Sequence, residues 1–397
     1  MKRKNYIFAI LYLAYTAIYI SRLNLSVATP AFVNMGIADA AQIGLLGSIF
    51  SVIYASGRLI SGGLGDKVAP WKMICTGLVL SSVSNLCIGF LPPFWGIALL
   101  WGANAFAQSM LWSSVLCIIS TIYSENKAKK MCSYMVTSVA TGNIIGILLN
   151  SLIAEKIGVN FAFIIPGGIT LVMSGLVLFG TLGIVPENKT EKKHISVFGL
   201  LKNKEILLMI IPAMLHGVIK DNISLWMVVY FVDSFGINLS DSANFVLFIP
   251  AVGFLGRLLY PAMYKMCKER EHVVSVSAFV VCALCALPLC FGLKSPAVAV
   301  VSLSMIYALV SVINTSILSI YPIRYADTGN VASVSGLMDF ATYGGAGISG
   351  WIFGITIKHF GYAPMYISWA VICVISAVLL CCTVLKKQKN GGENYAA

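Results

Sequence analysis

Charged residues are scarce in this sequence. Only 11% of its 397 residues are Asp, Glu, Lys or Arg, whereas about a quarter of an ordinary soluble domain is charged. Acidic residues are scarcer than basic ones, 15 against 27, and hydrophobic residues make up 58% of the chain. This composition excludes a soluble globular protein and indicates a chain that crosses a membrane repeatedly.

Recognisable catalytic and cofactor-binding patterns are also missing. The sequence contains no nucleotide-binding fingerprint, no metal-ligand constellation and no nucleophile at a recognisable spacing from a base. Nearly all of the 11 cysteines fall within apolar runs, which favours small buried side chains over a disulfide framework. A metal or redox role for Cys282 and Cys285 is the less favoured interpretation. We therefore expect no enzyme activity, no metal and no cofactor.

Long apolar runs, in contrast, fill the chain. A helix that rises about 1.5 Å per residue needs about 20 apolar residues to cross a hydrocarbon core of roughly 30 Å. The sequence predicts an all-α membrane protein with twelve transmembrane helices and no soluble domain. The twelve runs lie at 6–33, 40–61, 71–91, 94–123, 131–157, 161–184, 206–235, 242–264, 273–293, 296–320, 330–358 and 364–385.

Basic residues are divided unevenly between the two sides of the membrane. Seven segments on one side hold 20 Lys and Arg residues, and the opposite segments hold three, Lys156, Lys294 and Lys358. Because basic loops stay inside, we expect both termini in the cytoplasm and the protein in a plasma membrane, such as the bacterial inner membrane. The first run exceeds the apolar core of a signal peptide, so it should remain as a helix. Charge spread over seven loops argues against binding of nucleic acid.

Two halves of similar pattern make up the chain. The sequence "GRLISGGLGDK" begins at Gly57 and "GRLLYPAMYKM" begins at Gly256, 199 residues later. Duplication of a six-helix unit is typical of secondary transporters, which bind substrate near the membrane midplane between the repeats. The predicted domains are a six-helix bundle over 1–185, a cytoplasmic linker over 186–205, a second bundle over 206–385 and a tail over 386–397.

Four basic residues remain inside the predicted helices, at Arg22, Arg58, Lys220 and Arg257. Arg22 and Lys220 lie near the centres of their runs, at matching depths in the two halves. Each would cost about 2.5–3.5 kcal/mol if it faced lipid, so both should face the protein interior or a cavity. An arginine fork and a lysine point charge together suit an anion such as phosphate or carboxylate.

Polar residues around these two cations favour a binding cavity. In the first helix, Tyr15 and Tyr19 share a face with Arg22, and in the seventh helix His216 lies one turn before Lys220. The alternative is structural, with Arg22 and Lys220 paired to the acids Asp221 and Asp339. Arg58 lies near the inner end of its helix and could instead extend to the cytoplasm. The predicted substrate-binding residues are Arg22, Lys220, His216, Tyr15, Tyr19 and Arg58.

Three motifs resemble the major facilitator superfamily, and within it the organophosphate:phosphate antiporters, over essentially the whole chain. They are "YISRLNLSVATP" at 19–30, "GGLGDKVAP" at 62–70 and "KDNISLWMVVYF" at 220–231. The resemblance implies that Arg22 and Lys220 bind phosphate. It places Asp66 and Lys67 at the marked positions of a conformational loop, and Arg58 where these transporters often carry a cavity-facing lysine.

The sequence also departs from this family. A lysine replaces the usual arginine at Lys220 and is followed by Asp221, and Gly142 stands where the glycerol-3-phosphate carrier has a histidine. These changes concern which substrate is bound more than the anion class. The first helix is similar to that of the anion:cation symporters as well.

We expect a monomeric carrier that exchanges an organic phosphate for inorganic phosphate by alternating access. Arg22 and Lys220 would clamp the phosphoryl group, His216 would add a donor, and Tyr15 and Tyr19 would border the organic part. One alternative is a proton- or sodium-coupled carboxylate symporter, with Asp221 or Asp339 carrying the coupling ion. Another is a transporter-like sensor of sugar phosphate. The expected partners are a small anionic substrate and the lipid bilayer.

Overall fold

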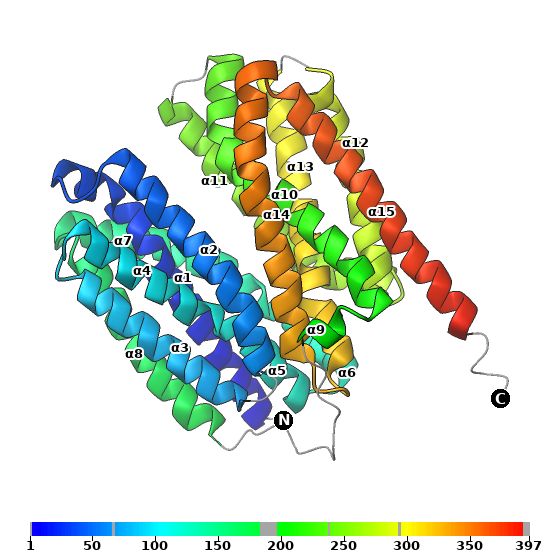
Figure 1. Cartoon of the computed structure of the whole chain (residues 1–397), viewed down its shortest axis with the longest axis horizontal. Coiled ribbons are helices and arrows are strands. Elements are labelled where there is room, and N and C mark those ends of the chain that lie inside the picture. The colour runs from blue at the N-terminus through cyan, green and yellow to red at the C-terminus, as the bar shows by residue number, and fades with distance from the viewer. Residues whose placement is uncertain (1, 66–67, 183–196, 237–238, 293–294, 392–397) are drawn as a thin grey trace. The chain divides into compact units, whose positions relative to one another are not determined.

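The computed structural model describes residues 2–65, 68–182, 197–236, 239–292 and 295–391, and every regular element within them is helical (Figure 1). The first eight helices are α1 (Lys2–Asn34), α2 (Ala40–Gly65), α3 (Pro70–Ile88), α4 (Phe94–Ser109), α5 (Leu111–Ile122), α6 (Glu125–Met135), α7 (Thr137–Lys156) and α8 (Phe161–Thr181). The others are α9 (Val197–Leu200), α10 (Lys204–Phe235), α11 (Leu239–Met266), α12 (Glu271–Cys290), α13 (Pro296–Asn314), the π-helix η1 (Thr315–Ile320), the 3-10 helix η2 (Tyr321–Tyr325), α14 (Val331–Phe360) and α15 (Ala363–Gly391).

The twelve predicted runs all coincide with helical segments, although three of them are interrupted. The run 94–123 divides into α4 and α5 at Met110, whose N–H bonds the carbonyl of Ala107 at 3.3 Å, a tighter turn than in an α-helix. The run 131–157 divides into α6 and α7 at Val136, and α13 continues into η1 and η2. Ten helical stretches in the described residues are long and apolar enough to cross a membrane.

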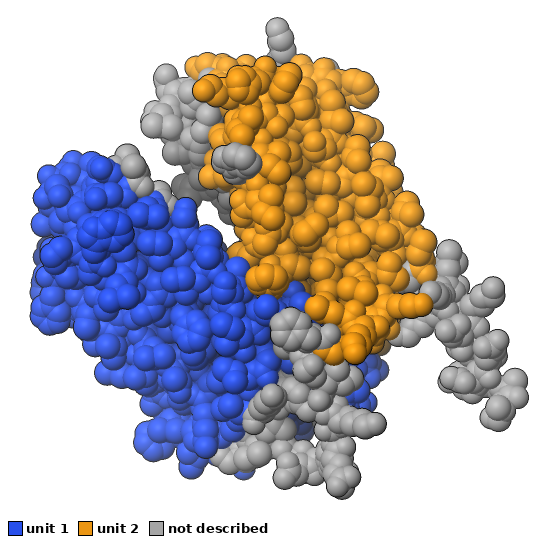
Figure 2. All heavy atoms as spheres, viewed as in Figure 1, with its two compact units in different colours: residues 1–197, 322–337 blue, residues 198–321, 338–397 orange. Residues whose placement is uncertain are grey.

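The helices gather into two compact units (Figure 2). Unit 1 comprises Met1–Val197 and Pro322–Leu337, and unit 2 comprises Phe198–Tyr321 and Met338–Ala397. Their first boundary falls within the predicted linker 186–205, most of which lies outside the described residues. Pro322–Leu337 belongs to unit 1, although the residues on either side of it in the chain belong to unit 2.

Two glycines explain why the beginning of α14 belongs to unit 1. A Cβ atom at Gly336 would lie 2.8 Å from the Cα of Gly62 and 2.4 Å from the carbonyl oxygen of Arg58. The Ser333 hydroxyl also donates to the carbonyl of Gly62, at 3.4 Å. Side chains at either glycine would separate the two backbones, so this close crossing depends on small residues.

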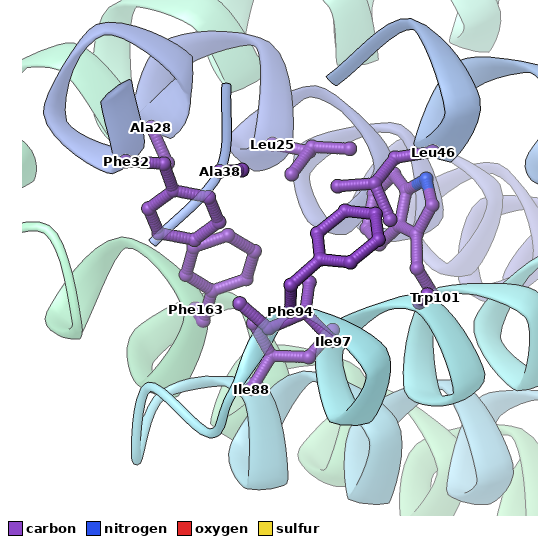
Figure 3. Packing of buried hydrophobic residues seen from close by; sticks show 11 residues of the cluster. Leu25, Ala28, Phe32, Ala38, Leu46, Ile88, Phe94, Ile97, Trp101 and Phe163 are labelled. Atoms are coloured by element: carbon purple, nitrogen blue, oxygen red, sulfur yellow. The ribbon is translucent and has the colours of Figure 1, made fainter. Parts of the chain in front are cut away.

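A cluster of buried apolar side chains connects five helices of unit 1 (Figure 3). Phe32 of α1 stacks on Phe163 of α8, with ring centroids 5.8 Å apart, and Trp101 of α4 is 3% exposed. Lipid tails are as apolar as these side chains, so close packing rather than exclusion of water stabilises the cluster. It fixes the part of α1 that follows Arg22. The cluster consists of Leu25, Ala28, Phe32, Ala38, Leu46, Ile88, Phe94, Ile97, Ala98, Trp101 and Phe163.

Candidate functional site

Arg22 faces the interior of unit 1, where a neutral amide and aromatic rings surround it. Its Nε donates a hydrogen bond of 2.8 Å to Oε1 of Gln108 on α4. The guanidinium carbon lies 4.7 Å from the ring centroid of Tyr19, 5.1 Å from that of Phe50 and 4.6 Å from that of Tyr54. Cation–π attraction of this kind contributes about 0.5–2 kcal/mol per ring. These contacts orient the guanidinium without neutralising its charge.

Tyr54 contacts a second cation in the same unit. The guanidinium carbon of Arg58 lies 5.1 Å from the centroid of the Tyr54 ring, which is 1% exposed. Arg58 itself is 3% exposed, so its side chain does not extend to the cytoplasm as the alternative interpretation required. One aromatic ring of α2 thus lies against the charged groups of both α1 and α2.

Tyr15 and Tyr19 differ in their placement. The Tyr15 ring is 3% exposed and packs against Trp112 of α5, with centroids 4.9 Å apart, and against Tyr19 at 5.6 Å. Tyr19 is half-buried and contacts the Arg22 guanidinium directly. Tyr15 therefore packs against Tyr19, and Tyr19 is the residue of this pair that lies beside the Arg22 guanidinium.

Close contact with α7 holds the helix that carries Arg22. A Cβ atom at Gly142 would lie 2.5 Å from the Cβ of Tyr19 and 2.9 Å from the carbonyl oxygen of Thr16. Further along, the Asn150 amide donates to the carbonyl of Ile20 at 2.8 Å. A larger side chain at the position of Gly142 has no room here, because α1 occupies that space.

Lys220 lies on α10 in unit 2, beside an acid and an aromatic ring. Its Nζ is 3.3 Å from Oδ1 of Asp221 and 5.1 Å from the ring centroid of Tyr343 on α14. The two charged side chains are 22% and 39% exposed. The pairing of Lys220 with Asp221 is part of the structural alternative considered from sequence, and it gives this cation a local counter-ion.

The His216 side chain contacts the neighbouring helix α13. The side chain is fully buried, and its Nε2 lies 3.1 Å from the carbonyl oxygen of Val310 on α13. At the next residue, a Cβ on Gly217 would lie 2.0 Å from the carbonyl of Thr342, so α14 covers this turn of α10. That His216 donates to the substrate stays a prediction, and in this structure its Nε2 is bonded to the carbonyl of Val310.

The remaining predicted residues are Asp339, Asp66 and Lys67. Asp339 lies on α14 and is 3% exposed. Asp66 and Lys67, predicted as the conformational loop, lie outside the described residues. Within the part of the chain that the structure describes, no three His, Cys, Asp or Glu side chains are grouped to hold a metal ion.

Four contacting residues escaped the sequence analysis, namely Gln108, Phe50, Tyr54 and Tyr343. Phe50 and Tyr54 lie four residues apart on α2, in line with Arg58, which is the helical spacing that could have indicated them. Gln108 and Tyr343 gave no such signal, since their roles depend on which helices become neighbours.

This sequence matches a known protein family and several known proteins. Residues 11–350 match the Major Facilitator Superfamily. The probable hexose phosphate transport protein of Chlamydia trachomatis is 27% identical over 183 residues, which are 46% of this chain and 40% of that protein. The membrane sensor protein UhpC of Salmonella typhimurium is 24% identical over 280 residues, 64% of this chain and 63% of that protein. The matches thus span less than two thirds of either relative.

A solved structure has the same fold. The crystal structure of the E. coli fucose:proton symporter FucP superposes with a TM-score of 0.78 and 16% sequence identity, over 94% of this chain and 97% of that chain. At this identity the likeness concerns the fold alone. The predicted all-α membrane fold is confirmed.

Proposed function

Since the chain belongs to the Major Facilitator Superfamily, we propose that it carries an organic phosphate across the membrane in exchange for inorganic phosphate, by alternating access. It is a multi-pass membrane protein and not an enzyme. A sugar phosphate or glycerol phosphate is the proposed organic substrate. The similarity of this chain to a probable hexose phosphate transport protein supports this class.

The setting of Arg22 carries the proposal. A hydrogen bond to Gln108 and three aromatic rings hold its guanidinium, and none of these four groups carries a negative charge. A planar fork of donors matches two oxygens of a phosphoryl group, and charge-assisted bonds of this kind are about twice as strong as neutral ones. Tyr19 would border the organic part of the substrate, and Arg58 would add positive potential through its position beyond Tyr54.

Lys220 is the proposed second phosphate-binding cation, with Tyr343 beside it. A phosphate dianion would compete with Asp221 for the ammonium group, because the two lie 3.3 Å apart in the structure. Such a partly exposed pair contributes about 0.2–1 kcal/mol, which a dianion can overcome. The substrate would thus replace an internal carboxylate at this cation.

The same ion pair favours a second candidate function, a proton- or sodium-coupled symporter for carboxylates such as sugar acids. Asp221 already compensates Lys220 without substrate, so closure around the site without an anion meets less repulsion. In that case Asp221 would bind the coupling proton and release Lys220 when protonated. Asp339 is the other acid proposed for this role.

A sensor is a third candidate, and the name of one relative supports it. The membrane sensor protein UhpC matches 64% of this chain. A sensor would bind a sugar phosphate with the same cations without moving it at a useful rate. We propose a monomer in the bacterial inner membrane with both termini in the cytoplasm, whichever of these functions it performs.

The function is tested by uptake into proteoliposomes that contain the purified protein. Labelled inorganic phosphate is offered outside, and unlabelled sugar phosphates, glycerol phosphate and sugar acids are offered as competitors. We expect phosphorylated compounds to compete and sugar acids to fail. Competition by sugar acids alone would favour the symporter, and binding of a sugar phosphate without uptake would favour the sensor.

A further inference from the structure

Behind Arg22, four buried amide side chains form one continuous chain of hydrogen bonds. Nε2 of Gln108 donates to Oδ1 of Asn104 at 3.1 Å, and Nδ2 of Asn85 donates to the same oxygen at 3.3 Å. Nδ2 of Asn24 then donates to Oδ1 of Asn85 at 2.7 Å. Since Arg22 and Asn24 both lie on α1, the chain leaves that helix, crosses α4 and α3, and returns to it.

The neighbouring groups determine which way each amide points. Oδ1 of Asn24 accepts from the backbone N–H of Leu25 at 2.8 Å, so its NH2 group must face Asn85. The Asn85 amide also donates to the carbonyl of Ser81 at 2.8 Å, and the Ser81 hydroxyl donates to Oδ1 of Asn104 at 2.6 Å. Oδ1 of Asn104 therefore accepts three hydrogen bonds, from Ser81, Asn85 and Gln108.

This polarity leaves Gln108 one orientation. Its NH2 group must face the accepting oxygen of Asn104, and its Oε1 must face Nε of Arg22 at 2.8 Å. The reversed amide would bring two sets of N–H donors together at the guanidinium. Gln108 is 1% exposed and Asn104, Asn85 and Asn24 are 0% exposed, so water does not offer alternative partners.

We propose that Gln108, oriented by Asn104, is a positioning residue of the anion site, which holds the Nε edge of Arg22 so that the terminal nitrogens meet the phosphoryl group. The inference rests on the proposed role of Arg22 as an anion ligand. A neutral amide suits this task better than a carboxylate, because it fixes the guanidinium in place and leaves its positive charge to the substrate. In this proposal Gln108 and Asn104 do not bind the substrate themselves.

The test measures binding of inorganic phosphate to the purified full-length protein, with thermal unfolding recorded for every variant. Gln108→Leu removes the bond to Nε, and we expect phosphate affinity to fall by about ten- to a hundredfold, the range for a hydrogen bond to a charged group. Gln108→Glu keeps the shape but pairs a carboxylate with Arg22, so it should reduce the affinity further. Asn150→Ala is the matched control: Asn150 is a 0% exposed amide bonded to α1 in the same unit, but at Ile20 and not at Arg22.

A second measurement separates positioning from stability. In an Arg22→Lys background, which has no Nε, Gln108→Leu should cause little additional loss of phosphate affinity. Equal losses in both backgrounds, or equal losses in Gln108→Leu and Asn150→Ala, would overturn the inference. If the unmodified protein fails to bind phosphate, the proposed function fails. If it binds and the Gln108 variants bind equally well, the inference alone fails.

Discussion

The Nζ atom of Lys220 lies 3.3 Å from the carboxylate oxygen of Asp221, its immediate neighbour in the chain. Adjacent residues on a helix point in different directions, so a contact of this kind requires the long lysine side chain to bend toward the acid. The pair makes Asp221 an internal competitor of the substrate.

Asp221→Asn should strengthen phosphate binding by about twofold to fivefold, the energy of a partly exposed ion pair. It should also reduce uptake of phosphate into empty vesicles, because the Asp221 carboxylate no longer offsets the charge of Lys220 when no anion is bound. Calorimetric titration and vesicle uptake measure the two effects. Weaker phosphate binding in Asp221→Asn would show that the carboxylate supports the anion site and does not compete with it.

Lys220→Gln should weaken phosphate binding by about tenfold or more, since it removes a charge-assisted contact. The amount of folded protein should stay close to that of the unmodified chain, because the Lys220 side chain is 22% exposed and its pair with Asp221 adds little stability. Size-exclusion chromatography in detergent measures folding, and Lys220→Arg serves as the charge-conserving control. Loss of folded protein in both Lys220→Gln and Arg22→Lys would support purely structural charges.

Tyr54→Leu should reduce phosphate affinity by about twofold to thirtyfold, because it removes the ring that lies against Arg22 and Arg58. Tyr54→Phe keeps the aromatic face and should bind phosphate like the unmodified protein. The comparison isolates the ring from its hydroxyl. Equal weakening in the two variants would assign the effect to the hydroxyl and contradict the cation–π interpretation.

Gly142→Ala should destabilise the protein by about 1–3 kcal/mol, the usual result of overpacking. The added methyl group would lie 2.5 Å from the Cβ of Tyr19, a distance that α1 can relieve only by moving. Gly168→Ala on α8 is the matched control, since nothing lies within 4 Å of a Cβ there. Thermal unfolding in detergent should separate the two, and equal melting temperatures would mean that α1 and α7 are not tightly packed at this point.

The all-helical fold and the inward direction of Arg22 could be predicted from the sequence, because both follow from the energetics of the bilayer. Twenty apolar residues have few alternatives to a spanning helix, and a mid-membrane guanidinium has few alternatives to the protein interior. The interruptions at Met110 and Val136 left no mark in the hydropathy.

Partners of the cations were harder to predict. His216 and Lys220 share a helical face by spacing, yet Gly217 lets α14 approach so closely that the turn carrying His216 is fully buried. Gln108 of α4 meets Arg22 of α1 only through the packing of helices that are far apart in the sequence. Periodicity identifies a face of one helix, and the choice of neighbouring helix decides what that face contacts.

Uptake of labelled inorganic phosphate into proteoliposomes, at equal pH on both sides, tests the central claim of phosphate exchange most directly. One set of vesicles is loaded with unlabelled phosphate and the other is empty. Exchange predicts uptake several times faster into loaded vesicles, and Arg22→Lys should abolish most of that difference. Equal uptake into empty vesicles that rises with an inward proton gradient, and that is lost in Asp221→Asn or Asp339→Asn, would contradict exchange and identify a symporter.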